Sequence, residues 1–213
     1  MPDSLIARDL RKQYNQSTVI FDNLNVTFKP GTATGLIGAN GSGKTTLLRI
    51  LTTVAYPTSG SVLLGDLNIH EHPHTYLSHL GFAFDSSELP MFANTVEVLE
   101  AIMRSRNVWD DSSNERINAL LEMLDLDERR FNLIGTYSSG MMQKALIAMA
   151  LIANPDIILL DEPFRALDEA TVIRLKDYLL QKKQDGKIII LSSHNSELIQ
   201  ELCESVIEFP YVG

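Results

Sequence analysis

A run of eight residues with the spacing Gly-x-x-x-x-Gly-Lys-Thr carries the strongest chemical signal in this chain. It extends from Gly38 to Thr45, between an apolar strand-like segment and a helix-like one. Glycines let such a loop wrap a polyphosphate with its backbone N–H groups, and the next helix points its positive N-terminus at the phosphates. Lys44 can reach the β- and γ-phosphates, and the Thr45 hydroxyl can ligate Mg²⁺. The run therefore predicts a nucleotide site formed by Gly38, Asn40, Gly41, Ser42, Gly43, Lys44, Thr45 and Thr46.

Two adjacent carboxylates supply the second chemical signal. Asp161 and Glu162 follow the apolar run 157–160, so a buried strand would deliver them to its carboxyl end. There Asp161 can hold Mg²⁺ through water, and Glu162 can act as the general base that polarises an attacking water. The Asp-Glu pair favours ATP hydrolysis over a kinase reaction. The Asn-Lys-x-Asp element on which guanine specificity usually rests is absent from the sequence.

The elements that must position these residues alternate between strand-like and helix-like, which predicts an α/β fold. Residues from about 4 to 30 are rich in β-branched and aromatic side chains and predict short antiparallel strands. Shorter apolar segments predict strands near 34–38, 62–64 and 80–84. The continuous apolar runs 157–160 and 188–191 are typical of strands covered on both faces of a parallel sheet.

Helices are expected from about residue 94 to residue 153 and again after the acidic pair. Asn94-Thr95-Val96-Glu97 has the spacing of a capping box, and Ser113 precedes a second amphipathic segment. A third helix, 141–153, is apolar nearly all round and is expected to be buried. The segment 170–184 is expected to cross between two parallel strands.

Further residues fall in one order along the chain and complete a recognisable set. Tyr137-Ser138-Ser139-Gly140-Met141 precedes the buried helix, Ala166-Leu167-Asp168 follows the acidic pair, and His194 follows the run 188–191. With the phosphate loop, these motifs resemble those of the ATP-binding cassette (ABC) transporter ATPases. The resemblance covers the chain from about Leu5 to Phe209.

The resemblance implies a role for each matching residue. Tyr14 matches the aromatic that stacks on adenine, and His194 matches a switch histidine that contacts the γ-phosphate. Ser138, Ser139, Gly140 and Met141 match the signature motif, whose helix N-terminus would contact the γ-phosphate held by a second subunit. Asp168 matches the Asp-loop. The catalytic residues implied are Glu162, His194 and Lys44, and the metal ligands are Thr45 and Asp161.

The implied fold is a P-loop NTPase with a RecA-like core, an N-terminal antiparallel β subdomain and an inserted α-helical subdomain. The chain would be a single ABC ATPase domain over 1–213, with the core in about 1–85 and 146–213 and the helical subdomain in about 86–145. The cofactors are ATP and Mg²⁺. The implied partners are an integral membrane permease and a second ATPase subunit, in a homodimer or a heterodimer, on the cytoplasmic face of a membrane.

Three positions depart from the family pattern. Asp85 stands where a glutamine is usual; it can meet Mg²⁺ through water but lacks the amide donors. Ser139 replaces a glycine and Met141 a glutamine of the signature. The Tyr-Ser-Ser-Gly-Met form looks like that of exporters of antibiotics, drugs and polysaccharides, so export is the expected direction.

Composition limits the other functions. The formal net charge is −9 and the pI is about 5.0, which argues against a nucleic-acid partner. No segment reaches the roughly 18 apolar residues of a membrane span, so another chain must supply a transport pore. His70, His72 and His74 have alternate spacing in a polar segment before a helix, where no tetrahedral metal site is fixed.

Three alternatives compete with a transporter motor. A soluble ABC-type ATPase of DNA repair, chromosome structure or translation usually carries coiled-coil insertions, zinc modules or two cassettes, and this sequence has none. A non-catalytic regulatory cassette conflicts with intact Lys44, Asp161, Glu162 and His194. An unrelated P-loop kinase leaves the signature and His194 unexplained.

Overall fold

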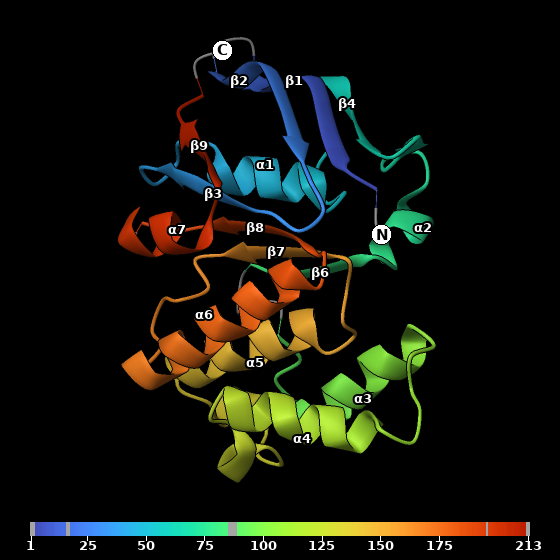
Figure 1. Ribbon diagram of the computed structural model, residues 1–213, viewed down its shortest axis with the longest axis vertical. Coiled ribbons are helices and arrows are strands. Elements are labelled where there is room, and N and C mark those ends of the chain that lie inside the picture. The colour runs from blue at the N-terminus through green and yellow to red at the C-terminus, as the bar shows by residue number, and fades with distance from the viewer. Residues whose placement is uncertain (1–2, 16–17, 85–88, 195, 212–213) are drawn as a thin grey trace.

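Two β-sheets lie above a group of helices in the computed structural model, which describes residues 3–15, 18–84, 89–194 and 196–211. In Figure 1 an antiparallel layer lies at the top, α1 (Lys44–Leu51) lies beneath it, and a parallel sheet crosses the middle of the molecule. The remaining long helices lie below the parallel sheet. The α/β prediction is confirmed.

The antiparallel sheet has the strand order β2-β1-β4-β5. Its strands are β1 (Leu5–Asn15), β2 (Thr18–Phe28), β4 (Ser59–Leu64) and β5 (Leu67–Asn68). The antiparallel strands predicted over residues 4–30 are confirmed, but the expectation that they are short was wrong, because β1 and β2 each extend over 11 residues. Shifts in their pairing register between Ala7 and Asn15 absorb the irregular sequence without ending either strand.

The parallel sheet has the order β6-β7-β8-β3-β9. Its strands are β3 (Ala33–Gly38), β6 (Leu80–Ala83), β7 (Ile157–Asp161), β8 (Ile188–Ser192) and β9 (Ser205–Phe209). In β7, Ile157 and Leu159 face the core beneath the antiparallel layer, while Ile158 and Leu160 face the helices on the other side. Because both faces are covered, the whole run is apolar, as the sequence predicted. Strand β9 was not predicted, since its edge position leaves Ser205, Val206 and Glu208 exposed.

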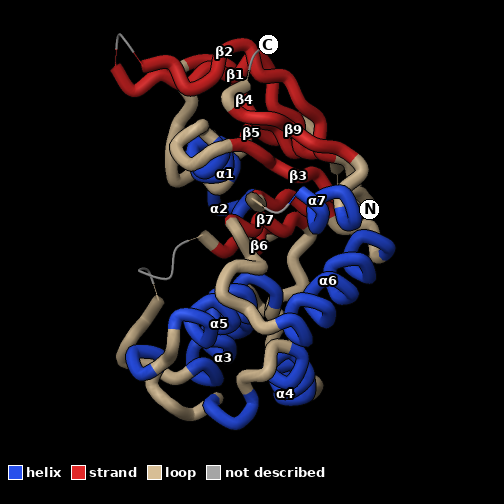
Figure 2. Tube along the Cα trace, turned by 90° about the vertical axis from the view of Figure 1, so that its left-hand side faces the viewer, coloured by secondary structure: helices blue, strands red, loops and turns tan. Residues whose placement is uncertain are grey.

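Helices gather on the lower side of the parallel sheet (Figure 2). They are α3 (Thr95–Ser105), α4 (Ser113–Met123), α5 (Ser139–Leu151) and α6 (Glu169–Gln184), joined by the 3₁₀ turns η2 (Asp127–Arg129) and η3 (Ile134–Thr136). Two short helices, α2 (Pro73–Leu77) and α7 (Ser196–Leu202), flank the sheet. Within the described residues, no helix is both long and apolar enough to cross a bilayer.

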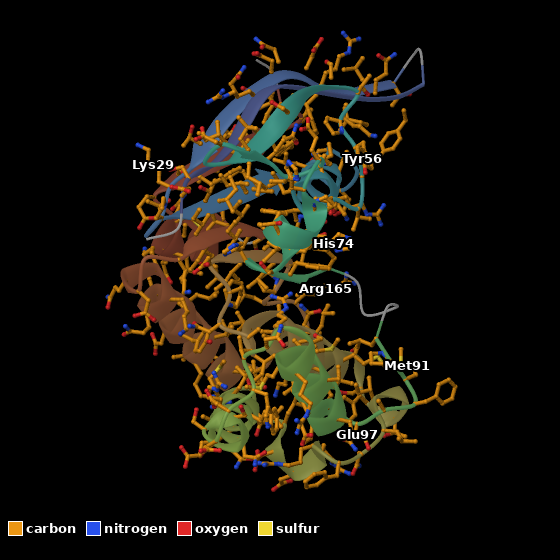
Figure 3. The ribbon with its side chains drawn as sticks, turned by 90° about the vertical axis from the view of Figure 1, so that its right-hand side faces the viewer. Lys29, Tyr56, His74, Met91, Glu97 and Arg165 are labelled. Atoms are coloured by element: carbon orange, nitrogen blue, oxygen red, sulfur yellow. The ribbon has the colours of Figure 1, made fainter. Side chains whose placement is uncertain are left out.

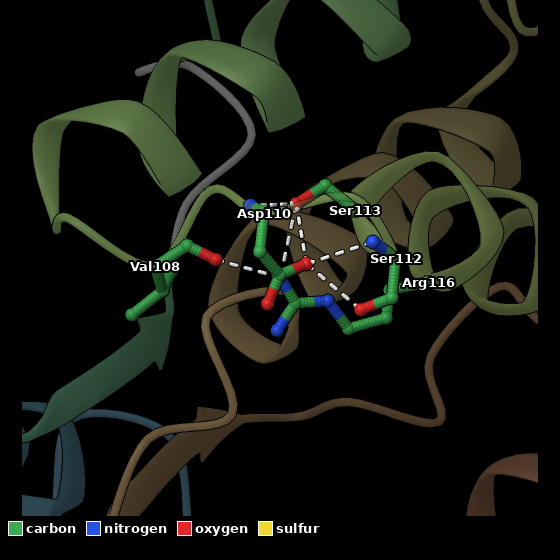
Figure 4. Close-up of polar contacts among 5 residues, drawn as sticks. All are labelled: Val108, Asp110, Ser112, Ser113 and Arg116. Carbon is green, nitrogen blue, oxygen red and sulfur yellow. Dashed lines mark hydrogen bonds and ion pairs between the residues drawn. The ribbon is translucent and has the colours of Figure 1, made fainter.

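Helices α3 and α4 begin in different ways. Asn94 and Glu97 form the capping box expected at the start of α3. Before α4, Asp110 takes the place of a capping residue. Its Oδ1 accepts hydrogen bonds from Ser112, Ser113 and Arg116 (Figure 4). Hydrogen bonds from Ser112 lower the pKa of the Asp110 carboxyl, and the nearby Arg116 adds to the effect. The carboxylate therefore organises this helix end.

Helix α5 is buried, as its apolar sequence predicted, but it begins at Ser139 rather than at Met141. Similarly, α6 begins at Glu169, one residue before the predicted start. In both cases the preceding residue, Ser138 or Asp168, has an extended backbone and caps the helix with its side chain. These two caps fix where the signature and Asp-loop segments end.

The segment that contains His70 and His72 forms turns that lead into α2. His70 is half-buried: its Nε2 lies 3.1 Å from the Ala55 carbonyl oxygen, and its ring lies 5.1 Å from the Tyr56 ring. Burial lowers the pKa of His70. Over the described part of the chain, no three His, Cys, Asp or Glu side chains gather in a way that could hold a metal ion.

Candidate nucleotide site

The phosphate loop connects β3 to α1, as the sequence predicted. Gly38, Gly41 and Gly43 have φ values of 142°, 76° and 120°, which side chains other than glycine rarely adopt. A Cβ on Gly38 would lie 2.3 Å from the Phe209 carbonyl oxygen, and one on Gly43 would lie 2.7 Å from an Ile20 methyl. The loop therefore passes close to β9 and β2 with no room for larger residues.

Lys44 is the first residue of α1 and is almost fully buried. Its Nζ donates to the carbonyl oxygens of Gly38 at 2.7 Å and Ala39 at 3.1 Å, which folds the side chain back across the loop. The ammonium is therefore held beneath the space that a phosphate chain would occupy. With three donors, it can keep these bonds and still bind a phosphate oxygen.

Strand order brings the two acidic residues to the phosphate loop. Strand β8 pairs with both β7 and β3, so the carboxyl ends of these three strands meet at one edge of the sheet. There the Thr45 hydroxyl donates to Oδ2 of Asp161 at 2.9 Å, and the Ser192 hydroxyl donates to Oδ1 of Asp161. A hydroxyl and a carboxylate in contact are hard oxygen donors of the kind that Mg²⁺ prefers, so Thr45 and Asp161 fit the predicted ion.

Glu162 and His194 lie against one another at the same edge. His194 Nε2 is 3.1 Å from Glu162 Oε1, within ion-pair distance but without the alignment of a hydrogen bond. The His194 backbone N–H donates to Glu162 Oε2 at 3.2 Å. Glu162 has a φ of 49°, which costs about 1–3 kcal/mol for a residue other than glycine. Its backbone N–H donates to Ser192, to the carbonyl at 3.2 Å and the hydroxyl at 3.0 Å, and these bonds hold the strained turn.

Tyr14 lies at the end of β1, above the start of α1. Its hydroxyl is 3.5 Å from Oγ1 of Thr46, and Lys12 Nζ lies 4.9 Å from the ring centroid. The side chain is 57% exposed, although large aromatic side chains usually bury most of their surface. An exposed ring beside the phosphate loop is placed to stack on a base.

The signature residues form the N-terminus of α5. Ser138 accepts a hydrogen bond from the Met141 N–H at 3.3 Å, and Ser138 and Ser139 are exposed. A Cβ on Gly140 would lie 2.6 Å from the Ala166 carbonyl oxygen, so only glycine allows this approach. Tyr137 is buried, and its hydroxyl lies 2.8 Å from Oγ1 of Thr95. This tyrosine anchors the signature segment to α3.

The phosphate pocket has a volume of about 410 Å³. The described residues that line it are Asn40, Gly41, Gly43, Lys44, Thr45, Thr46, Asp161, Glu162, Arg165 and His194. Most were predicted from the sequence. Gly38 and Ser42 shape the loop, while no signature residue is among the described residues that line the pocket of its own chain.

Two further predicted residues, Asp168 and Asp85, have different outcomes. Asp168 does not line the phosphate pocket; it caps α6 by accepting from the Thr171 N–H at 2.8 Å and pairs with Lys144. Asp85 falls outside the described residues. Gln143, which the sequence reasoning missed, donates to the Glu162 carbonyl at 3.4 Å from within α5.

Arg165 and Ser192 were not predicted from the sequence either, because neither belongs to a motif. The signal for Ser192 was its position at the end of the apolar run, one strand away from Asp161. The signal for Arg165 was a cation three residues after the proposed general base.

Comparison with known proteins gives one consistent result. A sequence profile described as ABC transporter matches residues 21–165. A Bacillus subtilis ABC transporter ATP-binding protein, YybJ, is 34% identical over 200 residues, which cover 94% of this chain and 89% of the relative. The bacitracin transport ATP-binding protein BcrA of Enterococcus faecalis is 30% identical over 93% of this chain, but the matched part is 63% of that protein.

Solved structures agree on the fold. The structure of an ATP-binding subunit of an ABC transporter has a TM-score of 0.90 at 24% identity, covering 96% of this chain and 85% of the other. A dimeric bacterial ABC transporter cassette, MJ0796, has a TM-score of 0.84 at 24% identity, covering 96% and 94%. The predicted P-loop NTPase fold is thereby confirmed, and the chain belongs to the ABC transporter family of ATP-binding proteins.

Proposed function

We propose that this chain is the ATP-hydrolysing subunit of an ABC transporter and drives export through a separate membrane permease. The observation that carries the proposal is the Glu162–His194 contact at the edge of a pocket that also contains Lys44, Thr45 and Asp161. A binding site for ATP alone needs no carboxylate in a strained turn beside the phosphates, whereas hydrolysis needs a base there.

In this proposal each residue acts on a defined atom. Lys44 and the loop N–H groups bind the β- and γ-phosphate oxygens, and Thr45 with Asp161 would hold Mg²⁺, which neutralises phosphate charge. Glu162 accepts a proton as water attacks the γ-phosphorus and the bond to the β–γ bridging oxygen breaks. His194 holds Glu162 in place and contacts the γ-phosphate, and the Tyr14 ring stacks on adenine.

The second part of the proposal is closure of a head-to-tail dimer. Ser138, Ser139 and Gly140 are accessible at the start of a 13-residue helix, where the helix dipole favours an anion. These residues do not line the described phosphate pocket of their own chain, which leaves them available to a γ-phosphate on a second subunit. The solved MJ0796 cassette is dimeric, and the same arrangement is proposed here, with an identical or a different partner chain.

The permease contact is assigned to the helical segment of about 86–145, inserted in a single ABC ATPase domain. Three large apolar side chains on this segment are exposed: Phe92 by 95%, Phe131 by 71% and Leu133 by 49%. The backbone N–H groups of Ile134 and Gly135 donate hydrogen bonds to the carbonyl oxygens of Ala93 and Met91. These bonds hold the stretch around Phe92 beside the stretch around Leu133. Such a patch favours a protein partner, here a permease reached at the cytoplasmic face of a membrane. Export is favoured by the Tyr-Ser-Ser-Gly-Met signature.

Sedimentation of Glu162→Gln with and without ATP tests the proposal, because this variant should bind ATP without cleaving it. We expect ATP and Mg²⁺ to convert monomer to dimer, and Ser138→Arg added to Glu162→Gln to prevent the change. Arg8→Gln added to Glu162→Gln is the control, since Arg8 is exposed on β1, away from the site.

Each result has a clear meaning. Loss of the dimer only with Ser138→Arg would support a shared ATP site. Dimers that form equally with both added substitutions would contradict the role of the signature. Failure of the unaltered protein to bind ATP would overturn the proposed function itself.

A further inference from the structure

We propose that Arg165 is a phosphate-binding residue that contacts the terminal phosphate of ATP in its own chain's pocket and so distinguishes ATP from ADP. This inference rests on the proposed function. It adds a residue to the site from outside the phosphate loop and the motifs that the sequence revealed.

The loop between β7 and α6 directs Arg165 toward the site. The Arg165 N–H donates to the Glu162 carbonyl at 3.1 Å, which closes a tight turn after the acidic pair. Ala166 then has a φ of 59°, so the chain bends sharply at the next residue. Figure 3 shows Arg165 at the level where the parallel sheet meets the helices below.

Arg165 lines three pockets of the described structure. One is the phosphate pocket, which it lines together with Lys44 and His194. A second has a volume of about 350 Å³ and includes Ser139 of the signature segment. The third extends from Arg165 along α6 and α7. Arg165 therefore lies where the phosphate pocket meets the spaces beside α5 and α6.

Arg165 is an exposed residue, and its guanidinium has no polar partner among the described residues. In the described part of the structure, no carboxylate lies within ion-pair distance of it, and no side-chain hydrogen bond of Arg165 is formed. Lys44, in contrast, already donates to two loop carbonyls. A guanidinium carries five donors in a planar fork that matches phosphate oxygens, so a free one in this pocket has an obvious ligand.

The charge balance of the pocket supports the same ligand. Lys44 and Arg165 contribute two positive charges to the lining of the phosphate pocket, and Asp161 and Glu162 contribute two negative charges. Arg165 is therefore one of two Lys or Arg side chains among the described residues that line this pocket. Because the β-phosphate is already bound by the loop and Lys44, the additional cation matters most for the γ-phosphate, which ADP lacks.

The experiment measures the affinity of Arg165→Gln for ATP and for ADP by titration calorimetry with Mg²⁺. Ser138→Arg is present throughout, so that each chain binds nucleotide without closing a dimer. We expect Arg165→Gln to weaken ATP binding about tenfold, as expected for one charge-assisted contact, and ADP binding less than twofold. Arg165→Lys should recover part of the loss, because it keeps the charge without the fork. Arg8→Gln should change neither affinity.

Equal losses for ATP and ADP, or no loss for either, would overturn the inference. A defect confined to ATP-dependent dimer formation in the Glu162→Gln background would also overturn it, since Arg165 would then act on the partner. If the protein with Arg165 intact binds no ATP, the proposed function fails and the inference falls with it. A loss in Arg165→Gln alone leaves the proposed function standing.

Discussion

Lys144 and Asp168 form an ion pair that ties the signature helix to the loop after the acidic pair. Lys144 Nζ is 2.8 Å from Asp168 Oδ2 and 3.1 Å from Asp125 Oδ2, and the lysine side chain is almost fully buried. Asp125 follows α4, Lys144 belongs to α5, and Asp168 caps α6. One ammonium group therefore holds three elements of the helical side of the molecule together.

Lys144→Met is expected to lower the free energy of unfolding by about 1–2 kcal/mol, less than for a fully buried pair, because both carboxylates are half exposed. The matched control is Lys176→Met, which removes a more exposed pair with Glu201 between α6 and α7 and should cost less than about 1 kcal/mol. Urea unfolding of both variants measures the difference. If both variants lost the same free energy of unfolding, the buried position of Lys144 would add nothing to the stability that its ion pairs provide.

The same pair predicts a pH dependence. Hydrogen bonds from Lys144 and then from Thr171 hold the pKa of Asp168 well below its usual range. The folded state thus favours the carboxylate, so this stabilisation is present above the unfolded pKa of about 3.9 and is lost as the pH falls below it. Asp168→Asn keeps a capping oxygen but removes the charge. Its unfolding free energy should fall less between pH 5 and pH 3 than that of the unaltered protein; parallel curves would refute the assignment.

His194→Ala is expected to lower the rate of ATP hydrolysis about 100-fold, because Glu162 loses its contact and the γ-phosphate loses a donor. The affinity for ATP should change little, since the loop and Lys44 remain. His74→Ala is the control, as His74 is exposed on α2. Steady-state turnover at saturating ATP gives the rate. Full activity in His194→Ala would remove this histidine from the mechanism.

Gly81→Ala is expected to destabilise the protein by about 1–3 kcal/mol, the usual cost of overpacking. A Cβ at Gly81 would lie 2.0 Å from the Ala150 carbonyl oxygen and 2.6 Å from Pro155 Cγ, so β6 would have to move away from α5. Gly186→Ala is a useful comparison, because its Cβ meets nothing and only its φ of +85° opposes the change, at about 1 kcal/mol. Thermal unfolding ranks the two, and a larger loss for Gly186→Ala would contradict this account.

The sequence by itself determined the phosphate loop, the acidic pair and the apolar strands that carry them. These features are local: a glycine pattern sets backbone dihedrals, and a continuous apolar run needs burial on both faces. The order of the motifs also indicated the family, and the capping box at Asn94 was read correctly from four residues.

Only the tertiary structure decided which side chains meet across the sheet edge. Strand β8 lies between β7 and β3, so Ser192 reaches Asp161 and His194 reaches Glu162 across more than 30 positions of sequence. Arg165 reaches the phosphate pocket through the turn that follows Glu162, and Lys144 meets Asp168 where α5 lies beside the start of α6. Which side chains meet depends on the order of the strands in the sheet and on the direction in which each loop leaves its strand. Both are set by the packing of the whole chain and cannot be inferred from one short segment.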